Sequence, residues 1–257
     1  MSLVFAAIAP HGGLAIAEAC PPDQRHLAAA TRAGFEELGR RAASAGVETM
    51  VVVTPHNVHL EGHFGVVEAG RLEGRLEGSA VRLEARSDLG LAAAVKAALR
   101  GAGLPMLGVS YGGNSAAEAV MPLDWAVLIP LWFLGGRARP PVETVVVTPC
   151  RELDAAAHQA AGRALAGALE ASDRRVGLVA SADHGHGHRP TGPYGFRAES
   201  EPYDRRVVEL VGQDRLAELA GFERSWVEAA AADSWWQLLM LEGSLAVTGP
   251  WRSKLLS

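Results

Sequence analysis

The stretch from Val176 to His188 reads VGLVASADHGHGH, and it is the starting point for interpreting the rest of the chain. It begins with an apolar run, which is typical of a buried strand in a parallel sheet. It ends in His184, His186 and His188, separated by glycines that let the backbone turn where the strand ends. Because ligands of open α/β sheets bind beyond the carboxyl ends of the strands, we expect these histidines at the mouth of a site. An ordinary solvated loop rich in histidine is the alternative.

The same order, an apolar strand followed by a histidine, occurs twice more in the chain. Residues 3–9 precede His11 and residues 49–54 precede His56, with a proline before each histidine. Parallel strands bring such turns to one edge of a sheet, and neutral imidazole is the commonest side-chain metal ligand. Two histidines and one carboxylate on one face are the usual ligand set for non-haem Fe(II). The pattern therefore predicts a metal site, although a proline that merely ends a strand would leave either histidine an ordinary loop residue.

Strand-like and helix-like segments alternate along the chain. Besides the three strands above, strands are predicted near 106–110 and 144–148, short strands within 60–85, and helices near 23–45, 87–99, 122–134, 154–171, 203–211 and 233–242. This alternation predicts an α/β fold: one three-layer domain over residues 1–257, with a mostly parallel central sheet, helices on both faces and a small added hairpin or sheet. Residues 189–204 are expected to form a long loop of the kind that covers a site.

Composition narrows the classes of function. The 257 residues are 49% hydrophobic and 21% charged, with a net charge of −5 and no basic block, so we expect neither a nucleic-acid nor a membrane partner. Two cysteines are too few for a disulfide framework and fit a reduced, cytoplasmic setting. The sequence has no signal-peptide pattern and no apolar stretch long enough for a membrane span. Because the sequence stops just after an apolar stretch, an extension of the natural chain beyond Ser257 is left open.

The remaining histidines receive structural predictions. We expect His59 and His63 at the surface or in a supporting position, and His26 and His158 on solvent-facing sides of helices. Motifs of zinc fingers, zincins, P-loop NTPases and serine hydrolases are missing from the sequence. The three strand-then-histidine turns thus remain the main indication of chemistry.

With these residues considered together, the chain resembles the class III extradiol ring-cleavage dioxygenases of the protocatechuate 4,5-dioxygenase β-subunit type. The resemblance spans most of the chain, and the order and spacing of its parts make it more specific than any one part. Four segments carry it: Ile8–His11 (IAPH), Val52–His56 (VVTPH), Leu123–Leu131 (LDWAVLIPL) and Ser181–His186 (SADHGH).

The resemblance implies roles for particular residues. His11 and His56 would bind Fe(II), and His186, counted from Ser181 and preferred over His184, would be the catalytic base. The family's third ligand is a glutamate early in a C-terminal helix, which aligns here near Ser234. Asp233 is therefore the expected ligand and Glu228 the alternative; if neither reaches the metal, the chain would be a family member without ring-cleaving activity.

The resemblance also implies an activity, with one departure. The expected function is a non-haem Fe(II)-dependent extradiol dioxygenase that cleaves a catechol-like, gallate-like or aminophenol-like ring with O₂. The expected partners are this small aromatic substrate, O₂, further copies of the chain in a dimer or larger homo-oligomer, and in some cases a small second subunit. Trp125 stands where the family has a histidine, so the substrate can differ. The alternatives are a metal-dependent hydrolase that uses zinc in the same pocket, and a non-catalytic metal-binding relative or partner subunit.

Overall fold

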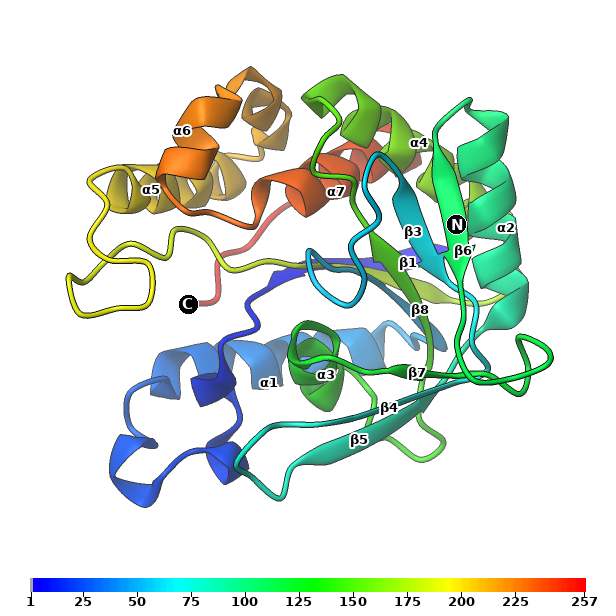
Figure 1. The fold of residues 1–257 in the computed structure, drawn as a ribbon, viewed down its shortest axis with the longest axis horizontal. Coiled ribbons are helices and arrows are strands. Elements are labelled where there is room, and N and C mark those ends of the chain that lie inside the picture. Colours follow the sequence, from blue (N-terminus) through cyan, green and yellow to red (C-terminus); the bar gives the residue numbers. More distant parts are fainter. Residues whose placement is uncertain (1) are drawn as a thin grey trace.

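Apolar, β-branched runs of the sequence form the central sheet. The computed structural model describes residues 2–257, and its main sheet has six strands in the order β1-β9-β2-β8-β3-β6 (Figure 1). These strands are β1 (Leu3–Ala9), β2 (Thr49–Val53), β3 (Phe64–Val67), β6 (Met106–Val109), β8 (Glu143–Thr148) and β9 (Val176–Ser181). Neighbouring strands pair in parallel except β3 with β8, so the sheet is mostly parallel, as predicted.

The three strands that precede histidines are neighbours in this sheet. β9 lies between β1 and β2 and pairs in parallel with both. Ala9 is in register with Ser181, and Val53 is in register with Ala180, so the three strands end at nearly the same level. Their following turns therefore share the carboxyl edge of the sheet.

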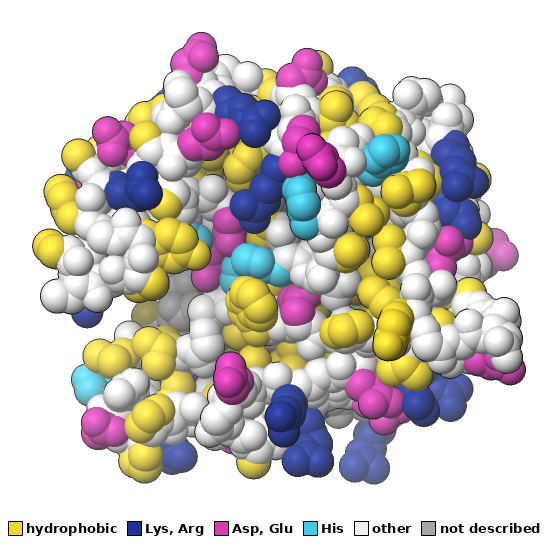
Figure 2. All heavy atoms as spheres, in the orientation of Figure 1, with side chains coloured by type: hydrophobic (Ala, Val, Ile, Leu, Met, Phe, Trp, Pro, Cys, Tyr) yellow, Lys and Arg dark blue, Asp and Glu magenta, His cyan; other side chains and the backbone are white. Residues whose placement is uncertain are grey.

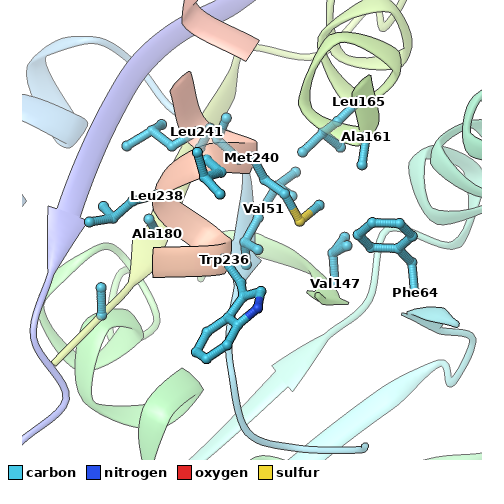
Figure 3. Packing of buried hydrophobic residues seen from close by; sticks show 14 of the residues in the cluster. Val51, Phe64, Val147, Ala161, Leu165, Ala180, Trp236, Leu238, Met240 and Leu241 are labelled. Atoms are coloured by element: carbon cyan, nitrogen blue, oxygen red, sulfur yellow. The ribbon is translucent and has the colours of Figure 1, made fainter. Parts of the chain in front are cut away.

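Helices cover both faces of the main sheet (Figure 1). The helices are α1 (Ala29–Ser44), α2 (Leu89–Gly101), α3 (Trp125–Phe133), α4 (Ala155–Glu170), α5 (Ser200–Gly212), α6 (Arg224–Ala229) and α7 (Trp235–Thr248). One hydrophobic cluster joins α2, α4 and α7 to one face, where Met240 and Leu241 of α7 lie near Leu165 of α4 and Val51 of the sheet (Figure 3). A second cluster joins α1 and α3 to the other face, so both clusters share the sheet within one α/β domain.

A small second sheet lies beside α3. It consists of β4 (Arg71–Arg75), β5 (Arg82–Arg86) and β7 (Val120–Pro122), in the order β5-β4-β7. β4 and β5 form an antiparallel hairpin, and β7 pairs in parallel with β4. The added sheet predicted from the segment 60–85 is thus present, but the first strand of that segment, β3, joins the main sheet.

Several local predictions were wrong. His158 is fully buried, not solvent-facing: it lies on the side of α4 that faces the sheet, where its ring contacts Phe64 edge-on at 5.1 Å and its Nδ1 bonds to the carbonyl of Asp154 at 2.7 Å. His26 is exposed but lies before α1, which begins only at Ala29. The short helix α6 was not predicted, and α5 already begins at Ser200, inside the expected loop.

No helix among residues 2–257 has the length and apolar character needed to cross a membrane.

Candidate metal centre

Three side chains from distant parts of the chain meet at the carboxyl edge of the main sheet. His11 follows β1, His56 follows β2, and Asp233 lies in the turn before α7. Oδ2 of Asp233 is 3.3 Å from Nε2 of His11 and 3.2 Å from Nε2 of His56. One ligand atom from each residue lies within 4.8 Å of the others, so the three can bind one metal ion together.

Hydrogen bonds fix the orientation of His11. Its Nδ1 lies 3.0 Å from Oγ of Ser181, and this hydroxyl donates its own hydrogen to the carbonyl of Ala126 at 2.5 Å. Ser181 therefore accepts from Nδ1–H, and the lone pair of Nε2 is left to face Asp233. Such a hydrogen bond to the second ring nitrogen selects the tautomer that a metal-binding histidine needs.

Asp233 carries a buried negative charge. Its side chain is almost fully buried, and its Oδ1 has no hydrogen-bond partner among residues 2–257. Burial by itself would raise the pKa of Asp233, but the two ring nitrogens of His11 and His56 beside its carboxylate outweigh that effect and hold the pKa well below the ordinary value. The pKa of His11 is raised: burial lowers it, and the carboxylates of Asp233 and Asp183 more than offset that. A buried carboxylate with an unpartnered oxygen, next to two imidazole nitrogens, fits a divalent metal ion of the Fe(II) or zinc type.

The His56 turn is joined to the start of α3. Asn57 adopts a left-handed backbone conformation (φ 71°), and its Nδ2 donates to the carbonyl of Pro122 at 2.8 Å. Asp124 caps α3 by accepting from the backbone N–H groups of the first helical turn. This places the ring of Trp125 4.5 Å from the ring of His56, with 47% of Trp125 exposed. Trp125 therefore forms a wall of the site, at its open side.

The histidines that follow β9 have separate partners. Nδ1 of His184 lies 3.0 Å from Oγ of Ser234, next to the expected ligand Asp233 in sequence. Burial lowers the pKa of His184. Exposed His188 pairs with the carboxylate of Asp204 at 3.0 Å.

His186 has a defined tautomer. Its Nδ1 lies 2.7 Å from the carbonyl of Ala231, and because a carbonyl only accepts, Nδ1 carries the hydrogen. Nε2 is then a free proton acceptor. The ring of Tyr194, from the loop between β9 and α5, lies 4.9 Å from the His186 ring. Figure 2 shows histidines in the middle of this face, with acidic and basic side chains beside them.

Other predicted residues lie apart from His11, His56 and Asp233. Glu228 is 55% exposed and pairs with Arg224 at 2.7 Å on α6, so it is not the carboxylate that faces the two histidines. His59 is 58% exposed and pairs with Glu152, in agreement with its predicted surface position.

Sequence reasoning missed Asp183. Its Oδ1 accepts the backbone N–H of His11 at 2.8 Å, and its Oδ2 lies 3.7 Å from Nε2 of His11. Asp183 lies two residues beyond the last residue of β9, and this position after a buried strand was the only signal in the sequence that could have indicated it.

Comparison with known proteins identifies the family of the chain. The model of the LigB family, described as the catalytic LigB subunit of aromatic ring-opening dioxygenase, matches residues 5–256. The chain belongs to the LigB family. The family resemblance noted from the four sequence segments is therefore confirmed.

Two individual proteins also match the chain at low sequence identity. "Protein CA_C1420" of Clostridium acetobutylicum is 20% identical over 211 residues, which make up 81% of this chain and 44% of that protein, so the chain spans less than half of this relative's length. The crystal structure of uncharacterized protein JW3007 from Escherichia coli K12 matches with a TM-score of 0.53 at 18% identity, covering 82% of this chain and 80% of that one. At this identity the second match shows the α/β fold alone.

Proposed function

We propose that this LigB-family chain is a non-haem Fe(II)-dependent extradiol dioxygenase that opens a catechol-like or aminophenol-like ring with O₂. The observation that carries the proposal is the convergence of His11, His56 and Asp233 in a chain that the family model matches over residues 5–256. Two imidazoles and one carboxylate leave other coordination positions open, which a reaction between two substrates requires.

The three converging side chains would hold the metal. Fe(II), when bound there, would supply open positions for the substrate oxygens and O₂ and a route for electrons between them. Ser181 keeps Nε2 of His11 free for this role through the hydrogen bond at Nδ1. Asp233 supplies the negative charge that offsets part of the charge of the metal.

We assign the general base to His186. Its Nδ1 donates to the carbonyl of Ala231, so Nε2 can accept a proton from a substrate hydroxyl and pass it on after ring opening. His184 is the competing candidate, but burial lowers its pKa and therefore disfavours the protonated form that a base must reach. The ring of Tyr194 lies beside His186 on this side of the site.

Trp125 lies at the open side of the site, at the position where the resemblance places a histidine in the family. Its indole ring, half exposed beside His56, offers a flat apolar surface for an aromatic ring and no general acid or base. We therefore propose that substrate proton transfer depends on the histidines of the β9 loop alone.

The proposal is tested by metal analysis followed by oxygen uptake. The protein is purified anaerobically, loaded with Fe(II), and supplied with catechol or 2-aminophenol while O₂ consumption and product absorbance are recorded. We expect one iron per chain, equal uptake of O₂ and substrate, and loss of stoichiometric metal in His11→Ala and His56→Ala. The exposed variant His59→Ala is the matched control and should keep its metal.

Other outcomes would replace the proposal. Hydrolytic activity with zinc and without O₂ uptake would indicate a metal-dependent hydrolase. Full metal retention in both histidine variants would show that the metal, if any, binds elsewhere, and would indicate a non-catalytic relative.

We further propose a cytoplasmic setting and a homo-oligomer. Cys20 and Cys150 are both free and buried, which fits a reducing compartment. Light scattering on the purified protein would give the oligomeric state, and co-purification from cells would show whether a small second subunit is present.

A further inference from the structure

A groove of about 820 Å³ lies at the open edge of the main sheet, beside the candidate metal centre. Its floor is β1, an edge strand of the sheet, and its walls are α1, α5, the end of α7 and residues 251–257. In Figure 2 the molecule is hollowed at the left, between the part that holds α5 and the part that holds the start of α1. This volume is typical of sites for small organic molecules.

Most of the lining is apolar. Ile8 of β1, Leu38 of α1, Val208 and Val211 of α5, and Leu245 of α7 face the groove. Val208 is 39% exposed, although it lies on a helix whose other side is buried. Apolar side chains that face a shared hollow from four elements form a surface that an apolar ligand would remove from water.

The inner end of the groove belongs to the candidate site. Asp183, His184 and His186 line the groove, together with Pro10, the residue before His11. Oδ2 of Asp183 lies 3.7 Å from Nε2 of His11. Asp183 therefore both lines the groove and lies beside one of the expected metal ligands.

The last residues of the chain cross the open edge of the sheet. Ser253 is held at the end of α5, where its N–H donates to Oδ1 of Asp214 at 2.6 Å. Leu256 and Ser257 reach α1, because a Cβ added at Gly34 would lie 3.5 Å from Cβ of Leu256. This crossing segment lies in the way of a second copy that would pair with β1, whereas it leaves room beneath it for a small molecule.

We propose that the groove binds an apolar substituent of the substrate ring, so that the substrate class is a catechol bearing an alkyl or aryl chain. This inference rests on the proposed ring-opening function. The diol end would lie at the three metal ligands, next to the proton acceptor His186, and the chain would run past Asp183 toward α5 and α7. Affinity should then increase with chain length by about fourfold per fully buried methylene.

The test compares catechol with 4-hexylcatechol in the Fe(II)-loaded enzyme. We expect a KM for 4-hexylcatechol that is about 100-fold lower, the result of burying three to four methylenes, with a similar kcat. A second readout needs no turnover: calorimetric binding of 4-hexylphenol, which lacks the second hydroxyl, should be tighter than that of phenol by a similar factor.

Matched tryptophan variants test whether the dependence on chain length arises in the groove. Val208→Trp on α5 and Ala246→Trp on α7 both place an indole in the groove. Val247→Trp is the control, because Val247 is 54% exposed on α7 and does not line the groove. The two groove variants should raise the KM for 4-hexylcatechol and weaken 4-hexylphenol binding at least about tenfold, while the KM for catechol stays within about twofold and the control matches the wild type.

The outcomes separate this inference from the proposed function. If the wild type cleaves catechol but neither KM nor binding depends on chain length, the groove assignment is wrong and the ring-opening function stands. If no catechol is cleaved while 4-hexylphenol binds in the groove, the proposed function fails instead. Light scattering that shows a dimer dissociated by both groove variants and not by Val247→Trp would make the groove a surface for a second copy and overturn the ligand assignment.

Discussion

Two sets of histidines lie at the carboxyl edge of the main sheet, and their surroundings differ. His11 and His56 both direct Nε2 toward the same oxygen of Asp233. The three histidines after β9 instead have three unrelated partners: a serine hydroxyl, a backbone carbonyl and a half-buried carboxylate. The same sequence pattern, a strand followed by histidine, thus gives side chains that converge on one carboxylate in one case and side chains with separate partners in the other.

The difference follows from what faces each turn. The turns after β1 and β2 face the segment before α7, which brings a buried anion between them. The loop after β9 runs along the same segment, so His184 bonds to Ser234 and His186 to Ala231, on either side of Asp233. A buried carboxylate beside two imidazole nitrogens can share a metal ion with them, whereas a carbonyl or hydroxyl fixes a tautomer and leaves one nitrogen free for proton transfer.

Removing the charge of Asp233 should have the largest effect, because it removes the feature that distinguishes the first set of histidines from the second. In Asp233→Asn the two imidazoles lose their shared anionic partner, so we expect loss of stoichiometric metal and of essentially all ring-opening activity. Metal content by mass spectrometry and O₂ uptake are the measurements. Glu228→Gln is the matched control and should keep both, since Glu228 pairs with Arg224 at the surface; metal loss in the control alone would assign the ligand to Glu228.

Removing the imidazole of His186, in the second set, should impair proton transfer and leave metal binding unchanged. We expect His186→Ala to lower kcat by about 10²–10⁴-fold, the usual contribution of a general base, with iron content unchanged. His184→Ala and His188→Ala should lose less. An inactive His184→Ala protein beside an active His186→Ala protein would transfer the role to His184.

Changing the tautomer of His11 should weaken the metal site without destroying it. Ser181→Ala removes the acceptor of Nδ1–H, so we expect metal affinity to fall about 10–100-fold, as for other partners of ligand histidines. Competition with a chelator measures this. Ser244→Ala removes another buried hydroxyl, bonded to the carbonyl of Gly162 far from the metal ligands, and should leave metal affinity unchanged. Equal losses in the two variants would show a general effect on stability.

The smallest expected effect is on the pH dependence of folding stability, and it involves His158, which belongs to neither set of histidines. Burial lowers the pKa of His158 from its ordinary value of 6.5, so the unfolded chain binds this proton more readily than the folded one. Its contribution to stability is complete above pH 6.5 and decreases as the pH falls below that value, by at most about 1.4 kcal/mol per pH unit.

The matching variant is His158→Gln, a neutral donor for the carbonyl of Asp154. Denaturant unfolding between pH 7.5 and 5 should show a smaller loss of unfolding free energy in this variant than in the wild type. An equal or steeper loss would contradict the assignment.

Much of the fold was predictable from local sequence patterns. The apolar runs before His11, His56 and His184 specify buried parallel strands, because only strands covered on both faces are apolar at every position. The proline or glycine after each run ends the strand at a definite residue. These signals are local, and parallel strands that end in this way bring their turns to one edge of the sheet. The strand-then-histidine pattern therefore indicated two of the three candidate ligands, His11 and His56. Asp233 came from the family resemblance, with Glu228 as an open alternative.

Only the tertiary structure decided which groups meet there. Asp233 rather than Glu228 faces the histidines because the turn before α7 enters the core while α6 stays at the surface. His158 is buried because the apolar side of α4 packs on the sheet, and a helical pattern so rich in alanine does not reveal which side that is. Asp183, Tyr194 and the groove along β1 result from contacts between residues far apart in sequence. No local pattern encodes such contacts, since they depend on how the strand order and the packing of the helices bring distant segments together.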